Sequence, residues 1–380
     1  MTDKYILAEE ITTLNKRKIG RVTLNRPQSM NALNSDMIDR LYKQLQQWRN
    51  DRSIACVILD GAGEKSFCAG GDIQALYRGL IGQAESPSGS QPPCATDYFE
   101  REYRLDYLIH TYPIPIIAWG KGIVMGGGLG LFIGAKFRVV TETTKMAMPE
   151  VTIALFPDVG TSYFLNRLPA KVGRFMSLTA ATLNCIDGLY LGLADFGLGN
   201  DQLPTIIEQL SQANWTENAQ KNSTIIENIL HLGATDFSRS IKNKKDLHNE
   251  IEGRMATIES LCSPADVHTV LENIHQLNRD DPWLNKARLG SISGSPLNAL
   301  IIDRHLQSCS NLSLKDVFQA DLTLAANIVN HTEIIEGVRA LLIDKDRTPQ
   351  WLYKHHSEVP DAVVDPFFIP PWDVSPLADL

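Results

Sequence analysis

Two carboxylates in one apolar segment are the first residues that could do chemistry. The segment MPEVTIALFPDVG, residues 148–160, places Glu150 and Asp158 among apolar side chains and between prolines, where solvated surface acids would be out of character. Burial raises the pKa of an unpaired carboxylic acid, which suits it to general acid–base or nucleophilic chemistry near neutral pH. The alternative is that both acids cap loops or pair with arginines.

A glycine-rich corner follows the strand-like run IACVILD and its GAG turn. The segment FCAGGDI, residues 67–73, places Gly70 and Gly71 just before an apolar i, i+3, i+4, i+7 pattern that starts at Ile73, so Asp72 is expected to cap a helix. Glycines carry no Cβ, so a ligand oxygen can approach the backbone N–H groups that point outward at a helix start. The alternative is a plain tight turn.

A second glycine corner, MGGGLGL at residues 125–131, follows the strand-like run IIAWGKGIV. Three consecutive glycines would cost a helix roughly 1 kcal/mol each relative to alanine, so we expect a close backbone approach rather than a plain helix start. The spacing is not that of a dinucleotide-binding fingerprint, so a pyridine-nucleotide enzyme is not expected. Together the two corners can aim two N–H groups at one carbonyl oxygen, an oxyanion hole in which each donor contributes about 3–4 kcal/mol to transition-state stabilisation.

The elements that must position these residues alternate short β-rich runs with helical patterns over the first 145 residues, which is typical of α/β folds. Strands are predicted at about 4–9, 18–25, 54–60, 115–121 and 137–141. Between the second and third strands, Asn34 is expected to cap an amphipathic helix whose apolar face consists of Met37, Ile38, Leu41, Leu45 and Trp48.

The later chain changes character. Residues 84–97, AESPSGSQPPCATD, predict an irregular surface excursion, and the helical pattern that follows carries Glu102. From about residue 200 to 346 the pattern is predominantly helical, and the prolines after it predict an extended tail packed by Phe367, Phe368 and Trp372. The expected organisation is a core at 1–200, a helical C-terminal region at 201–357 and a proline-rich extended tail at 358–380.

Composition bounds the class of protein. The 380 residues, 43% hydrophobic and 21% charged, suit a globular protein with a principal core and an appendage. The net charge of −8 argues against a general nucleic-acid or anionic-membrane surface, and the longest apolar runs fall short of the roughly 20 residues that span a bilayer. Six scattered cysteines without C-x-x-C spacing suit a reduced compartment, and the acidic start without an apolar signal core predicts a cytoplasmic protein.

Four segments together resemble the crotonase, or enoyl-CoA hydratase/isomerase, superfamily: LNRPQSMNAL (24–33), SFCAGGDI (66–73), MGGGLGL (125–131) and MPEVTIALFPDVG (148–160). Within it the chain is most similar to the subgroup of 3-hydroxyisobutyryl-CoA hydrolases, and EGVRALLIDKDRTPQW (336–351) resembles the C-terminal signature of that subgroup. The likeness covers nearly the whole chain. It implies an α/β core built as a crotonase-like spiral of β-β-α units, with CoA draped across it, and a helical C-terminal region.

The resemblance also implies roles for single residues. The backbone N–H groups of Gly71 and Gly127 would form the oxyanion hole for a thioester. Glu150 matches the second catalytic glutamate of the hydratases, but Gly130 stands where a hydratase carries its first. Adding water across a double bond ordinarily needs both carboxylates, so the resemblance favours hydrolysis. Asp158 stands where hydratases commonly have glycine, as in the hydrolase subgroup.

By the same resemblance, the substrate is contacted at Glu102, Gly127, Glu150 and Asp158. The CoA path is lined by Arg26, Asn31, Ala32, Leu33, Ala69, Gly70, Gly71, Asp72 and Ile73, although residues 26–33 equally fit a strand-to-helix turn. Glu150 would attack the thioester carbonyl or activate a water, and Asp158 would bind the substrate hydroxyl or manage protons; the sequence leaves both choices open. Glu102 could also be an ordinary solvated glutamate.

The expected function is therefore hydrolysis of an acyl-CoA thioester, first 3-hydroxyisobutyryl-CoA of valine catabolism and second 3-hydroxypropionyl-CoA. Two alternatives stand beside it: enoyl-CoA hydration or isomerisation, and a catalytically inactive acyl-CoA-binding scaffold. No cofactor apart from the CoA of the substrate, no metal, no nucleic-acid partner and no membrane partner are expected, and homo-oligomerisation is left open. The histidines, including His355 and His356, are expected to have surface or satisfied-core roles.

Overall fold

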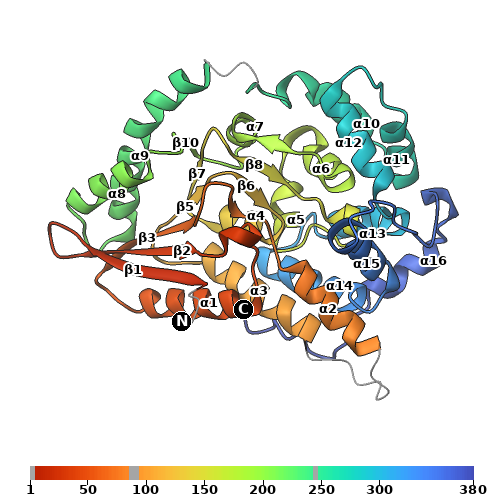
Figure 1. Cartoon of the computed structure of the whole chain (residues 1–380), viewed down its shortest axis with the longest axis horizontal. Helices are drawn as coiled ribbons and strands as arrows, with labels where there is room; N and C mark the ends of the chain where they lie inside the picture. Colours follow the sequence, from red (N-terminus) through yellow and green to blue (C-terminus); the bar gives the residue numbers. More distant parts are fainter. Residues whose placement is uncertain (1–4, 85–93, 243–246) are drawn as a thin grey trace. The chain divides into compact units, whose positions relative to one another are not determined.

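The computed structural model describes residues 5–84, 94–242 and 247–380. Its elements follow one another in the order shown in Figure 1. The chain divides into two compact units, each built from three segments. We call them the sheet unit (Met1–Gly71, Leu105–Met146 and Leu183–Glu252) and the helical unit (Asp72–Arg104, Ala147–Thr182 and Gly253–Leu380). The sequence predicted three consecutive regions with boundaries at residues 200 and 357, whereas each of these units combines segments from different parts of the chain. The predicted division stays a prediction.

The sheet unit contains a six-stranded sheet. In sheet order its strands are β1 (Ile6–Thr12), β2 (Lys18–Leu24), β3 (Ile54–Gly61), β5 (Ile116–Gly120), β7 (Phe137–Val140) and β10 (Phe196–Gly197). The first pair is antiparallel and every later pair is parallel. All eight residues of β3 are buried, as expected of a parallel strand that is covered on both faces.

A smaller sheet carries the first glycine corner. Its strands are β4 (Ser66–Cys68), β6 (Ile123–Met125), β8 (Lys145–Ala147) and β9 (Leu183–Asn184). The pair β4 and β6 is parallel, so both of these strands end at the same edge, just before the two glycine corners. This pairing is the feature of the fold that positions the glycines.

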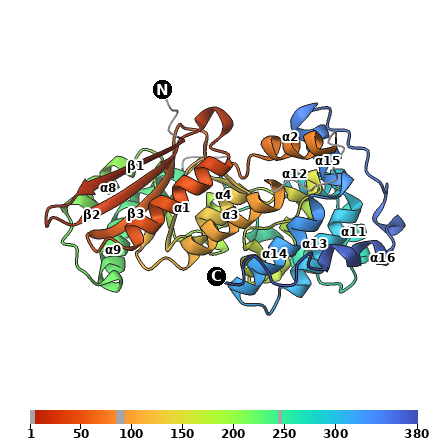
Figure 2. The ribbon, with the colours of Figure 1, turned by 90° about the horizontal axis from the view of Figure 1, so that it is seen from below.

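Helices cover the main sheet. Figure 2 shows α1 beside β1 and β2, and Trp48 of α1 donates its indole N–H to Glu10 over 2.9 Å. Apolar side chains of α8 and α9, such as Leu210 and Leu230, share one core cluster with Ile58 and Trp119 of the sheet. The helices of the sheet unit are α1 (Ser35–Arg49), α4 (Gly127–Gly134), α7 (Cys185–Tyr190), α8 (Leu203–Gln212) and α9 (Ala219–Lys242), with the short helix η1 (Pro27–Ser29).

The helical unit is built almost entirely from helices, and α3 runs from it into the sheet unit. Its longer helices are α2 (Ile73–Ala84), α3 (Cys94–His110), α6 (Val172–Thr179), α10 (Met255–Cys262), α11 (Val267–His275), α12 (Pro282–Ser293), α13 (Pro296–Ser308) and α14 (Leu314–Ile328). Its shorter ones are η2 (Glu150–Ile153), α5 (Thr161–Leu165), η3 (Pro169–Lys171), η4 (Glu252–Arg254), α15 (Thr332–Val338), η5 (Arg339–Ile343), η6 (His356–Glu358), α16 (Asp361–Val364) and η7 (Asp365–Phe368). No helix within the described residues combines the length and apolar character that crossing a membrane requires.

Several sequence-based expectations are confirmed. Strands lie at all five predicted places, and the Asn34 side chain caps α1 by accepting from the Met37 backbone N–H over 2.9 Å. The Asp72 side chain accepts from the Ala75 N–H over 3.1 Å at the start of α2, as expected. The five cysteines with described side chains are buried and free, which suits packing roles.

Two expectations are wrong. The irregular excursion was predicted to last through residue 97, but α3 already begins at Cys94; residues 85–93 lie outside the described part. The tail is not extended, because it forms α16 and η7, in which Pro366 sits in the first turn where a proline is tolerated. Phe367 and Leu377 are buried, and the tail carbonyl of Phe367 accepts from the Asn327 side chain over 2.8 Å.

Candidate active site

The first glycine corner is held by a neighbouring turn of the sheet unit. The Leu33 N–H donates to the Gly70 carbonyl over 2.8 Å, and Leu33 and Gly71 form a parallel bridge. In a parallel bridge of this kind the N–H of Gly71 points away from Leu33, so it is free to face a ligand. Gly70 has a φ of 104°, a conformation that L side chains rarely adopt, which explains glycine at this corner.

The second glycine corner packs directly against the first. A Cβ added at Gly128 would lie 2.2 Å from the Cys68 carbonyl oxygen, and one added at Gly70 would lie 3.4 Å from the Gly127 nitrogen. The predicted close backbone approach is therefore confirmed. The expectation against a plain helix needs correction, because α4 begins at Gly127; its N–H, as the first of the helix, has no intrahelical acceptor. Both amides proposed for an oxyanion hole thus lie where the two corners meet.

The turn predicted to line the CoA path is shaped by its own polar groups. Asn31 is fully buried and donates both amide hydrogens within the fold, to the carbonyls of Ala62 and Ser66 over 3.0 Å each. Its side chain can therefore contribute to CoA binding only through the shape of the turn. The Arg26 guanidinium donates to the Ala32 carbonyl over 2.6 Å, which fixes the turn further.

The three predicted acids are brought together inside the helical unit. Glu102 comes from α3, Glu150 is the first residue of η2, and Asp158 lies in the loop before α5. Their exposed fractions are 2%, 4% and 4%, so the predicted burial of Glu150 and Asp158 is confirmed, and Glu102 is not a solvated surface glutamate. We call Glu102, Glu150 and Asp158 the acid cluster.

Burial and mutual repulsion set the protonation of the acid cluster. Burial raises the pKa of Glu150 well above its ordinary value, and the charge of Asp158 raises it further. The same two causes, in the same order, raise the pKa of Glu102. Burial raises the pKa of Asp158 to about 7, although a hydrogen bond from Tyr103 favours its charged form. The protonation of the three acids is therefore coupled, and the pKa of Asp158 lies near neutral pH, where a proton acceptor in catalysis is most effective.

The hydrogen bonds of the acid cluster are unequal. The Tyr103 hydroxyl donates to Asp158 Oδ2 over 2.8 Å. Glu102 Oε1 and Glu150 Oε2 are buried, and neither has a hydrogen-bond partner among the described residues. A buried carboxyl oxygen without a partner is costly and rare, so these two atoms are suited to a water or a substrate group.

A histidine–aspartate pair that the sequence did not point to supports the Asp158 loop. Asp321 Oδ2 accepts from the Gly160 N–H over 2.8 Å, and its Oδ1 is 2.7 Å from His305 Nε2. Burial lowers the pKa of His305, but the hydrogen bond with Asp321 outweighs it and the pKa rises to about 10. His305 is thus protonated at neutral pH. One signal in the sequence could have pointed to this pair: both residues are polar and lie on the buried faces of two amphipathic helices, α13 and α14.

Two residues of the same loop have a strained backbone. Ala154 and Val159 have φ values of 55° and 52°, in the left-handed region that β-branched residues in particular avoid. The Asp158 carbonyl accepts from the N–H and the hydroxyl of Thr161 over 2.9 and 2.6 Å, which holds the strained turn in place. Strain of this kind persists only where the surroundings enforce it, and it is common at functional sites.

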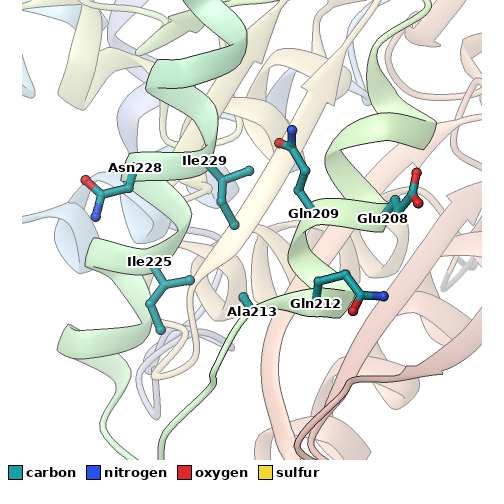
Figure 3. Close-up of a pocket in the computed structure, with 7 residues that line it drawn as sticks. All are labelled: Glu208, Gln209, Gln212, Ala213, Ile225, Asn228 and Ile229. Carbon is teal, nitrogen blue, oxygen red and sulfur yellow. The ribbon is translucent and has the colours of Figure 1, made fainter.

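A groove in the sheet unit contains none of the residues of the acid cluster or the glycine corners. It has a volume of about 510 Å³ and lies between α8 and α9. Figure 3 shows the residues that line it, which are Glu208, Gln209, Gln212, Ala213, Ile225, Asn228 and Ile229. None of them was predicted to be catalytic.

Comparison with known proteins shows the family of this chain. The family model for enoyl-CoA hydratase/isomerase matches residues 19–368. A relative from Gallus gallus, named 3-hydroxyisobutyryl-CoA hydrolase, mitochondrial, is 36% identical over 352 residues, which cover 92% of this chain and 86% of the relative.

Two solved structures share the fold. A carnitinyl-CoA dehydratase from Mycobacterium thermoresistibile is 28% identical with a TM-score of 0.81, covering 98% of each chain. An enoyl-CoA hydratase from Rhodobacter sphaeroides is 26% identical with a TM-score of 0.80, covering 97% of this chain and 98% of its own. The predicted crotonase-type α/β fold with a helical C-terminal region is confirmed, and the chain belongs to the enoyl-CoA hydratase/isomerase family.

Proposed function

We propose that this chain hydrolyses the thioester bond of a small 3-hydroxyacyl-CoA, with 3-hydroxyisobutyryl-CoA of valine catabolism as the first substrate. The observation that carries the proposal is the composition of the acid cluster: Glu150 is accompanied by Asp158 and Glu102, while Gly130 occupies the place of the first hydratase glutamate. The name of the Gallus gallus relative supports the same reaction.

The chemistry assigns a step to each group. The N–H groups of Gly71 and Gly127 hold the thioester oxygen as it becomes negative, because donors fixed in advance are worth most in the transition state. Glu150 attacks the carbonyl carbon or removes a proton from a water that does so. The carbon–sulfur bond then breaks, and the thiolate takes up the proton that the acid cluster holds. Where Glu150 itself attacks, this leaves an anhydride between the acyl group and Glu150, which water hydrolyses to release the acid and restore the carboxylate. The products are CoA and the free hydroxy acid, the latter from the acyl group and the oxygen of water.

The remaining acids suit the polar end of the acyl group. Glu102 Oε1 is the second partnerless carboxyl oxygen of the acid cluster and can accept a hydrogen bond from a substrate hydroxyl. Asp158 accepts a proton from Glu150 or from water, since Tyr103 favours its charged form.

Hydration of an unsaturated acyl-CoA is the rival reaction, because both solved structures bear names of hydratase-type enzymes. A panel of saturated 3-hydroxyacyl-CoA and unsaturated acyl-CoA esters, with a reagent that traps free thiol, separates the two. We expect thiol release from 3-hydroxyisobutyryl-CoA and, second, from 3-hydroxypropionyl-CoA. Consumption of unsaturated esters without thiol would establish the rival. No turnover of any ester, with CoA still bound, would establish an inactive scaffold.

Compartment and assembly stay predictions. The cytoplasmic location expected from the sequence differs from the word mitochondrial in the name of the Gallus gallus relative, which describes that protein. Homo-oligomerisation remains open to a measurement of mass in solution.

A further inference from the structure

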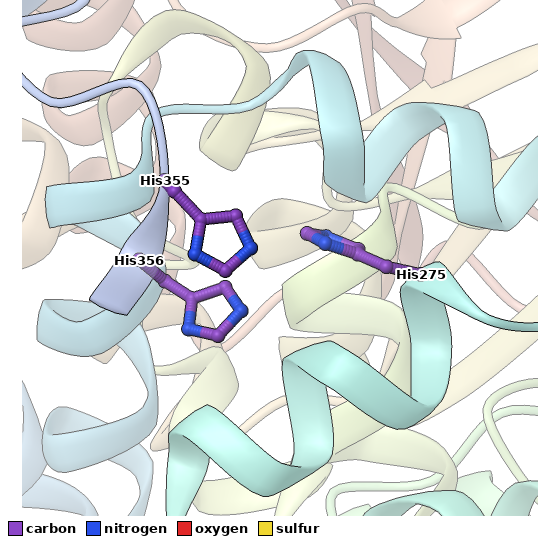
Figure 4. Close-up of side chains that lie close together, drawn as sticks. All are labelled: His275, His355 and His356. Carbon is purple, nitrogen blue, oxygen red and sulfur yellow. The ribbon is translucent and has the colours of Figure 1, made fainter. Parts of the chain in front are cut away.

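Histidines that are far apart in the chain meet at one place of the helical unit. His275 ends α11, His355 is the N-cap of η6, and His356 is the first residue of η6. One possible ligand atom from each of the three lies within 4.8 Å of the others. Figure 4 shows the rings of His355 and His356 directed toward that of His275. The sequence showed only the neighbouring pair, because the third ring arrives from a helix some eighty residues earlier.

The ring of His356 is oriented by a fourth histidine. Its Nδ1 lies 3.1 Å from the Nδ1 of His268, which precedes His275 on the same helix, α11. Its Nε2 is buried and has no hydrogen-bond partner among the described residues. His356 is only 4% exposed, so water does not readily satisfy this nitrogen. A buried nitrogen of this kind, with the opposite nitrogen fixed, is the arrangement found in histidines that bind metals.

The other two rings each make hydrogen bonds through one nitrogen. His355 Nδ1 lies 2.8 Å from the Ser357 hydroxyl and accepts from the Ser357 N–H over 3.3 Å. His275 Nε2 lies 3.3 Å from the Ser291 hydroxyl. Each ring therefore keeps its second nitrogen for another partner, His355 its Nε2 and His275 its Nδ1.

A carboxylate completes the set. Glu272 Oε2 lies 3.9 Å from His356 Nε2 and 4.0 Å from His355 Nε2. Its other oxygen, Oε1, accepts from the Gln276 amide over 2.5 Å, which holds the carboxylate in place. Three imidazoles and one carboxylate make a donor set that suits zinc and the neighbouring divalent metals.

We propose that His275, His355 and His356 bind one divalent transition-metal ion of the zinc type, with Glu272 as the fourth ligand. In a tetrahedral site with Zn–N bonds of about 2.0–2.1 Å, the nitrogens stand about 3.3–3.4 Å apart. Closing the present spread of up to 4.8 Å takes rotations of side-chain torsions. This proposal replaces the expectation of a chain without a metal.

The place of the site indicates a structural role. It joins η6, close to the C-terminal end, to α11, and it contains no member of the acid cluster. Binding a metal in the folded state alone stabilises that state by mass action. The site is independent of the proposed thioester hydrolysis.

The test titrates the full chain, prepared without a polyhistidine tag and stripped with a chelator, with Zn²⁺ in a calorimeter. Co²⁺ serves as a second probe, because its visible absorption reports tetrahedral coordination. We expect saturable binding of one ion per chain and a rise in the unfolding temperature. His356→Ala and His275→Ala should each weaken binding by more than about 100-fold, and His268→Ala by about 10–100-fold, as for the loss of a group that only orients a ligand.

His231→Ala is the matched control, because this histidine of α9 has a side chain that is 65% exposed and lies outside the cluster. It should bind Zn²⁺ as the wild type does. Circular dichroism checks that each variant is folded. Absence of saturable binding by the wild type overturns the proposal by itself, so a misfolded variant cannot rescue it. Equal affinity in folded His356→Ala and His275→Ala overturns it as well.

Discussion

Removal of one hydroxyl tests how the acid cluster is tuned. Tyr103→Phe deletes the donor that lies 2.8 Å from Asp158 Oδ2, and both side chains are buried. Burial raises the pKa of Asp158 to about 7, and the Tyr103 hydrogen bond works against that rise. Without the hydroxyl, the charged form of Asp158 loses its donor and the pKa rises further.

The size of the shift follows from the hydrogen bond. A hydrogen bond to a charged group contributes about 1.5–3 kcal/mol net. One pKa unit corresponds to about 1.4 kcal/mol, so the pKa of Asp158 should rise by about 1–2 units in Tyr103→Phe. Because kcat/KM follows the ionisation of the free enzyme, the shift is visible in its acidic limb.

The assay is thiol release from 3-hydroxyisobutyryl-CoA, measured as kcat/KM against pH. We expect an acidic limb near pH 7 in the wild type, as Asp158 ionises, and a limb about 1–2 units higher in Tyr103→Phe, with the rate recovering at high pH. Tyr112→Phe is the control, since it deletes a hydroxyl that donates to the Leu45 carbonyl over 2.6 Å and should leave the limb in place. An unmoved limb in Tyr103→Phe, with the rate lowered equally at every pH, would refute the reasoning.

Two further predictions concern stability. Gly128→Ala places a Cβ 2.2 Å from the Cys68 carbonyl oxygen, so the backbone must move and the free energy of unfolding should fall by about 1–3 kcal/mol. Gly79→Ala on α2, where an added Cβ meets no described atom within 4 Å, should raise it by about 0.5–1 kcal/mol; urea unfolding measures both, and equal effects would contradict the contact. The folded-state pKa of His305, about 10, lies above the unfolded value of 6.5, so the stability this group contributes is complete below pH 6.5 and is lost as pH rises through 10. His305→Gln should therefore flatten the decline of unfolding free energy over that range, and a slope like that of the wild type would show that His305 is not its source.

Local sequence patterns predicted those helices and strands whose structure depends mainly on nearby residues. The helix α1 was recovered from its Asn34 cap and its apolar spacing, and the central strands from runs of β-branched residues. The strand β10 was missed, because two residues make no pattern. The helix α4 contradicted the propensity of its glycines, since Gly128 is required by the Cys68 backbone that packs against it. Tertiary contact outweighed propensity there.

The candidate site, like the fold, could be predicted from the sequence only in part. Glu150 and Asp158 stood out because acids are unusual in an apolar segment, and their burial is confirmed. Asp321 and His305 did not stand out, because each looks like a polar break in the pattern of its own helix and the pairing exists only after α13 and α14 pack. The partnerless oxygen of Glu102 likewise depends on which side chains surround α3.

The most direct test of hydrolysis by the acid cluster is the rate of CoA release from 3-hydroxyisobutyryl-CoA by Glu150→Gln and by the wild type. The amide keeps the shape of the side chain but can neither attack the carbonyl nor accept a proton. We predict a loss of kcat by about 10²–10⁴ with the affinity for CoA retained, and equal or greater thermal stability, since a buried acid beside Asp158 is removed. Turnover by Glu150→Gln at the rate of the wild type would contradict the account.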